Sequence, residues 1–142
     1  MDFVALSKKY EEKIIALRRD FHQHPELSYK EVRTSQVVCD ELDKLGIPYV
    51  RLDENCVVGK LVGGKAQKGS PRLAIRADMD ALPIVEEAEL PFKSKNEGVM
   101  HACGHDGHTA ILLGTAKALQ KARSSFAGTV KLFFQPAEET LY

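Results

Sequence analysis

Hydrophobic residues at the start of the chain recur at intervals of three and four positions, as on one face of an α-helix. This apolar stripe consists of Phe3, Leu6, Tyr10, Ile14, Leu17 and Phe21. It predicts a long helix that ends before Pro25. The spacing of Ser28 and Glu31 is typical of a capping box and predicts that a second helix begins there. Gly46 and Pro48 then give that helix its stop signal.

Short apolar runs follow and predict strands. Val57–Val62 is rich in β-branched residues, and residues 73–77 and 130–134 read as buried strands, the former as part of a parallel sheet. Residues 109–122 return to a helical pattern, whereas residues 83–100 carry prolines and glycine and are expected to be irregular. Two helices followed by strands mixed with a helix favour an α/β sandwich.

Length and composition exclude several classes of protein. The 142 residues suit one domain, and 44% hydrophobic with 28% charged residues excludes disorder and fibres. Basic and acidic residues number 20 each, so nothing favours a nucleic-acid partner. The sequence contains no run of about 18 apolar residues, so no membrane span is expected. Three cysteines form no disulfide framework and fit a reducing compartment, so we expect a cytoplasmic location.

Three polar clusters interrupt this scaffold at places where ligands gather. Asp78 and Asp80 follow the predicted strand 73–77, and Glu138 and Glu139 follow the last strand. The third cluster, residues 101–108, directly precedes a helix. Ligands of open α/β sheets bind outside the carboxyl ends of the strands. The clusters therefore mark one candidate site.

The residue types of these clusters indicate a metal. Asp, Glu, His and Cys are the ligands of zinc and similar divalent ions. Cys103 and His105 are separated only by Gly104, which lets the backbone bend so that both side chains reach one site. A mixed set of thiolate, imidazole and carboxylate fits zinc, manganese or cobalt better than magnesium. We therefore expect Cys103, His105 and Glu139 to converge in space.

The density of histidine makes residues 101–108 the strongest signal. Three of the five histidines lie there, beside Cys103 and Asp106. His22 and His24 instead end the first helix, where positive charge suits the helix dipole. We expect no function from those two.

Each cluster also has an interpretation that involves no function. Asp78 and Asp80 are typical of a turn or a helix cap. Residues 138–139 are typical of a solvated pair that opens a helix. His108 is typical of a residue at a helix start without a role of its own.

Four segments resemble, in order and spacing, those of the N-acyl-amino-acid amidohydrolases, which include hippurate hydrolases and plant auxin-conjugate hydrolases. They are residues 18–27 (RRDFHQHPEL), 76–83 (RADMDALP), 101–108 (HACGHDGH) and 134–139 (FQPAEE). The family belongs to the wider aminoacylase and carboxypeptidase group of metallopeptidases. The resemblance implies that residues 1–142 are the N-terminal part of a three-layer α/β/α catalytic domain of the zinc-exopeptidase type.

The resemblance also implies roles for individual residues around two divalent ions, zinc, manganese or cobalt. Cys103 would bridge the ions, and His105 and Glu139 would be further ligands. Glu138 would be the general base, and Asp80 would orient a ligand. The implied reaction is hydrolysis of the amide bond of an N-acyl amino acid, in which Glu138 moves the proton of a metal-activated water to the leaving nitrogen.

The resemblance leaves three polar residues of the site uncertain. Asp78 stands where other branches of the group carry a metal-binding histidine, so it is expected to support the ligands rather than to bind. His101 and His108 have no implied role.

The chain ends at Tyr142, before the family's remaining histidine ligands and its dimerisation domain. The resemblance therefore implies a truncated domain of a homo-oligomeric parent, itself a poor catalyst and a weak metal binder. Residues 130–134 would be left as a hydrophobic edge strand, which predicts self-association.

Two other functions remain open. One is a non-catalytic binding fragment. The other is a thiol hydrolase that uses Cys103 with His105 or His108, although nearby carboxylates disfavour a thiolate.

Overall fold

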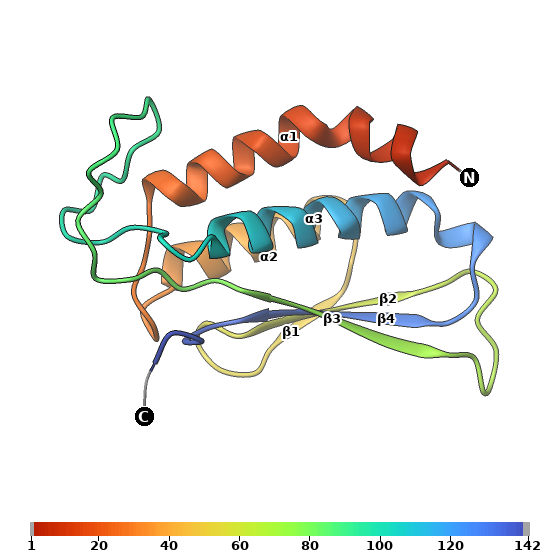
Figure 1. The fold of residues 1–142 in the computed structure, drawn as a ribbon. Helices are drawn as coiled ribbons and strands as arrows, with labels where there is room; N and C mark the ends of the chain where they lie inside the picture. Colours follow the sequence, from red (N-terminus) through yellow and green to blue (C-terminus); the bar gives the residue numbers. More distant parts are fainter. Residues whose placement is uncertain (1, 141–142) are drawn as a thin grey trace.

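The computed structural model describes residues 2–140, which form three α-helices, a short 3-10 helix and one four-stranded sheet. The elements in chain order are α1 (Phe3–Gln23), α2 (Val32–Leu45), β1 (Tyr49–Arg51), β2 (Val57–Val62), β3 (Arg72–Asp78), α3 (His105–Lys121), the 3-10 helix η1 (Arg123–Ser125) and β4 (Thr129–Gln135). The three α-helices lie on one face of the sheet, with α1 outermost against α3 (Figure 1). The α/β class is thus confirmed, and of the expected α/β/α arrangement the described residues form the sheet and the helices on one of its faces.

β4 occupies the interior of the sheet, whose strand order is β1-β2-β4-β3. It pairs antiparallel with β2 and parallel with β3. The expectation that this last strand forms a hydrophobic edge is therefore wrong. A long loop leads from β3 to α3, and the chain then returns between β3 and β2, so the strand order differs from the chain order. The edges are β1 and β3, and the argument for self-association through β4 no longer holds.

β3 is less buried than its sequence predicts. Leu73 lies on the helical face of the sheet, yet the residue is 57% exposed because β3 is an edge strand. Only the end of the strand, at Ala77 and Asp78, is buried. There the hydroxyl of Thr109 on α3 donates a hydrogen bond of 2.9 Å to the Asp78 carbonyl. The helix thus covers the end of β3 that leads into the site.

The core lies between the helices and the sheet. Phe21, Leu42, Leu132 and Phe134 are completely buried there. The predicted stripe of α1 faces inward at Tyr10, Leu17 and Phe21, while the side chain of Phe3 lies outside the described part of the structure. No helix among residues 2–140 has the length and apolar character needed to cross a membrane.

The start of α2 differs from the predicted capping box. The helix begins at Val32, so Ser28 lies too far upstream to cap it. The Glu26 carboxylate accepts the N–H groups of Arg33 and Thr34 at 2.9 and 2.8 Å. Glu31 makes no side-chain cap and is buried. The stop at Gly46, in the left-handed conformation with φ 64°, is confirmed.

Two further elements differ from the prediction. α3 begins at His105, ahead of the predicted start at residue 109, after Gly104 with φ 96°. β1 was not predicted, because three residues are too few to show a periodic pattern. Residues 83–100 contain neither helix nor strand, as expected.

We predict that Leu132→Ala lowers the free energy of unfolding by about 2–5 kcal/mol, because it leaves a cavity in the core. Leu73→Ala, on the same face of the adjacent edge strand, is the matched control and costs about 1 kcal/mol or less. Urea unfolding of both variants measures the difference. Equal costs would contradict the interior position of β4.

Candidate functional site

Three polar segments meet at the carboxyl ends of β3 and β4. β3 and β4 are parallel, and their ends lie side by side because Asp78 pairs with Gln135. The backbone N–H of Met79 continues the pairing, with a 3.0 Å hydrogen bond to the Gln135 carbonyl. α3 begins beside these strand ends with His105, which is buried. The clusters from the three segments therefore form one site, as the sequence predicted.

The Nε2 atom of His105 faces a group of carboxylates. Its Nδ1 lies 3.0 Å from the Asp80 carbonyl and 3.1 Å from Asp80 Oδ1. Both partners are acceptors, so Nδ1 is the donor of these bonds, and Nε2 is the ring nitrogen that remains to meet a ligand. Nε2 lies 3.8 Å from Glu138 Oε2, 3.8 Å from Glu139 Oε1 and 4.0 Å from Asp78 Oδ2. These distances are too long for hydrogen bonds and leave room for a cation.

Cys103, His105 and Glu139 converge as expected. Their ligand atoms all lie within 4.8 Å of one another. The Glu139 Oε1 atom is buried without a hydrogen-bond partner among the described residues. A buried carboxylate oxygen without a partner is costly unless a cation neutralises it. The residues therefore fit a divalent metal, while their roles as ligands remain predictions.

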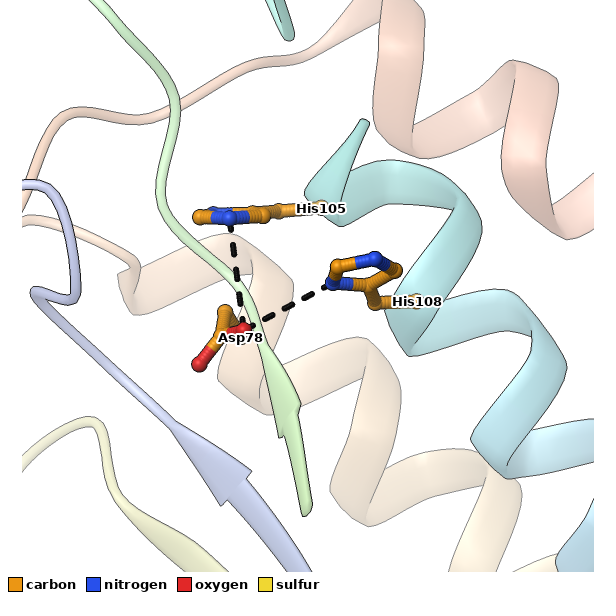
Figure 2. A group of neighbouring side chains, drawn as sticks. All are labelled: Asp78, His105 and His108. Carbon is orange, nitrogen blue, oxygen red and sulfur yellow. Dashed lines mark ion pairs between the residues drawn. The ribbon is translucent and has the colours of Figure 1, made fainter. Parts of the chain in front are cut away.

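A second group of ligand atoms shares His105 and includes Asp78 and His108 (Figure 2). His108 Nδ1 lies 3.5 Å from Asp78 Oδ2, and its ring stacks on that of His105 with centroids 5.3 Å apart. The other Asp78 oxygen lies 2.6 Å from the Arg76 guanidinium. Asp78 is therefore held on one side and faces two imidazoles on the other. The resemblance implied no role for His108, but its ring lies at the site.

Asp80 is completely buried behind His105. Its Oδ2 accepts hydrogen bonds from the Ser28 hydroxyl at 2.7 Å and from the Glu139 backbone N–H at 2.8 Å. Burial raises the pKa of Asp80, but these hydrogen bonds outweigh it, so the pKa lies below its usual range. An ionised carboxylate that orients a histidine ring in this way is typical of metal sites.

Comparison with known proteins identifies the family of this site. The model of peptidase family M20/M25/M40 matches residues 74–141, which include all three clusters. Thermostable carboxypeptidase 1 of Saccharolobus solfataricus is 50% identical over 137 residues, which cover 93% of this chain and 33% of that protein. The chain belongs to this family.

Other relatives of this M20-family chain agree. The N-acyl-L-amino acid amidohydrolase of Geobacillus stearothermophilus is 50% identical over 127 residues, or 89% of this chain and 34% of that protein. A structure from Bacillus subtilis, described as a dinuclear metal binding peptidase of family M20, superposes with a TM-score of 0.87 and 45% identity. The match covers 93% of this chain and 37% of that chain. The chain thus spans about a third of the length of the relatives it matches.

The thiol of Cys103 is exposed at the edge of the M20 site. Its pKa is raised, first by a hydrogen bond with Glu139, then by desolvation and by the charges of Glu139, Glu138 and Asp78. Without a metal the side chain is therefore a neutral thiol near pH 7. A thiolate nucleophile is disfavoured here, as the sequence analysis expected.

His101 lies behind the site rather than in it. Its ring is buried, and neither nitrogen has a hydrogen-bond partner among residues 2–140. Desolvation lowers its pKa to about 4, so the ring is neutral. His101 lies beside His22, with ring centroids 6.4 Å apart. It belongs to neither group of ligand atoms.

His22 is a buried member of an ionic cluster that the sequence analysis missed. Its Nδ1 lies 2.7 Å from Asp106 in the first turn of α3, and its Nε2 lies 2.9 Å from Glu86 in the irregular loop. Arg18, one turn earlier on α1, lies 2.9 Å from the same Asp106 oxygen. The cluster fixes the start of α3. The i, i+4 spacing of Arg18 and His22 beside buried Phe21 was the available signal.

We predict that Cys103 of the metal-free chain reacts more slowly with iodoacetamide at pH 8 than a free cysteine, because its raised pKa leaves little thiolate. Glu139→Gln removes the first cause of that shift and should speed the reaction. Peptide mass mapping separates Cys103 from Cys56 and Cys39. A Cys103 faster than free cysteine would instead favour the thiol hydrolase.

Proposed function

We propose that this chain supplies part of the active site of a metal-dependent hydrolase that cleaves the amide bond of N-acyl amino acids. The observation that carries the proposal is the free Nε2 of His105, which faces three carboxylates while Asp80 holds the opposite side of the ring. The names of the relatives support amide hydrolysis, since one is an N-acyl-L-amino acid amidohydrolase and another a carboxypeptidase.

Cys103, His105 and Glu139 would hold the metal. Two divalent ions, as described for the Bacillus subtilis relative, would polarise the amide carbonyl and acidify a water molecule. Zinc, manganese and cobalt suit the mixed ligand set. Cys103 is the exposed member of the set, and its thiolate would hold metal together with His105 and Glu139.

Glu138 is the proposed general base. Its side chain is 41% exposed, lies 3.8 Å from His105 Nε2 and forms no side-chain hydrogen bond among the described residues. A carboxylate that is accessible and unengaged can take a proton from water and pass it to the leaving nitrogen. Glu139 is the more buried of the pair, with 21% of its side chain exposed, which suits a ligand better than a base.

Asp80 would orient His105 through Nδ1 and keep Nε2 available as a ligand. Asp78 and His108 would border the metal site, with Asp78 held by Arg76. The three free cysteines fit a reducing compartment, so a cytoplasmic location remains our proposal.

We predict that Glu138→Gln, made at the matching position of a full-length relative, lowers turnover by about 10²–10⁴-fold and leaves metal content unchanged. Glu139→Gln is the matched control, because it removes a proposed ligand and should lower metal content as well. Elemental analysis and steady-state kinetics of the two variants distinguish the roles. Loss of metal in Glu138→Gln alone would reverse the assignment.

We further predict that the 142-residue chain binds metal weakly and turns over slowly. Cys103, His105 and Glu139 offer fewer protein ligands than a two-metal site needs. The measurement is hydrolysis of N-acetyl and N-benzoyl amino acids with added zinc, manganese or cobalt, with and without chelator. Turnover on the order of 1–10³ per second would show that these three ligands suffice. Metal binding without any turnover would favour the binding fragment.

A further inference from the structure

The turn after β4 presents two successive carboxylates to His105. Glu138 Oε2 and Glu139 Oε1 both lie 3.8 Å from His105 Nε2. Ala137, just before them, has φ 57°, which is unusual for a residue with a side chain. A backbone in this conformation persists only where its surroundings hold it, so the contacts of the turn determine where the two carboxylates stand.

Two buried carboxylates hold the backbone of this turn. Glu31 Oε1 accepts the Ala137 N–H at 2.8 Å, and Asp80 Oδ2 accepts the Glu139 N–H at 2.8 Å. Both acidic side chains are completely buried. The second Glu31 oxygen accepts a hydrogen bond from Asn55 Nδ2 at 3.2 Å. Asn55 thereby fixes the Glu31 carboxylate in the direction of the turn.

Besides Ala137 and Asn55, the Glu31 carboxylate has hydrogen bonds among the described residues only with backbone N–H groups close to it in the chain, those of Glu31 itself and Tyr29. It does not cap α2, whose first N–H groups bond instead to Glu26. Asp80 is different, because its other oxygen also orients His105. The two supports can therefore be separated by mutation: a change at Glu31 disturbs the turn without touching the His105 ring.

We propose that Glu31 is a positioning residue, which sets the places of Glu138 and Glu139 relative to His105 by holding the Ala137 N–H. This inference rests on the proposed function for its consequence in metal binding, but the positioning itself is independent of any metal.

Three substitutions at Glu31 separate charge from reach. Glu31→Ala removes both hydrogen bonds. Glu31→Asp keeps the charge but withdraws the carboxylate by one methylene. Glu31→Gln keeps the reach and one accepting oxygen. The new amide group can also donate to Asn55. The Asn55 side chain would then flip, so that its Oδ1, which is buried without a partner, becomes the acceptor.

The test uses the 142-residue chain and two readouts. Amide hydrogen exchange of residues 137–139 is measured without metal, and Co²⁺ affinity is measured from the cobalt–thiolate absorption of Cys103. We expect Glu31→Ala and Glu31→Asp to speed exchange at the turn by about tenfold or more, as for loss of a hydrogen bond to a charged group. Cobalt affinity should fall by about 10–100-fold. Glu31→Gln should stay close to the wild type in both.

Glu26→Ala is the matched control, because it removes the actual cap of α2 and leaves the turn alone. It should lower thermal stability without changing either readout. Turn exchange in Glu31→Ala and Glu31→Asp that rises no more than in Glu26→Ala would overturn the positioning role. A wild-type chain that binds no cobalt would contradict the proposed function instead, and the exchange data would still decide for or against Glu31.

Discussion

The carboxylate of Asp80 is the contact on which the rest of the site depends. One oxygen fixes the His105 ring at the start of α3, and the other accepts hydrogen bonds from Ser28, which precedes α2, and from the Glu139 backbone after β4. One buried group thus joins four segments that are far apart in the sequence. The hydrogen bonds that join them also keep the carboxylate ionised, because together they offset the cost of its burial.

The sheet topology makes this arrangement reachable. β3 and β4 are neighbours although α3 and the long loop separate them in the chain, and they are parallel. Their carboxyl ends therefore open on the same side, where the start of α3 also lies (Figure 1). The pairing of Asp78 with Gln135 then brings the Glu139 backbone N–H within hydrogen-bond distance of the Asp80 carboxylate. A shift of that pairing would move the Glu pair away from His105.

Local patterns were sufficient to predict the parts of the site that lie within single segments. The stripe ending at Phe21 predicted α1, and the ends of strands and the residue types predicted the convergence of Cys103, His105 and Glu139. The prediction for Glu31 failed, because its spacing from Ser28 fits a capping box equally well. Only the three-dimensional arrangement shows that Glu26 caps the helix.

Features that depend on pairing between distant segments could not be predicted. The apolar run 130–134 indicated a buried strand, but the pairing of β4 with β2 on one side and β3 on the other follows from the return of the chain after α3, which residues 129–135 do not reveal. The cluster around His22 likewise requires Asp106 and Glu86 to meet on either side of one ring. A histidine near a helix end fits the dipole argument just as well, so its sequence position alone does not reveal burial.

The site concentrates negative charge in a way that links metal binding to folding. Asp78, Glu138 and Glu139 surround His105 Nε2, and Asp80 lies behind the ring. Like charges at such distances repel, and burial strengthens the repulsion. The positive end of the α3 dipole and Arg76 offset part of it. The Glu139 oxygen that lacks a partner remains uncompensated. A bound cation would remove that remaining cost only in the folded chain, so its binding free energy would add to the stability of this edge of the sheet.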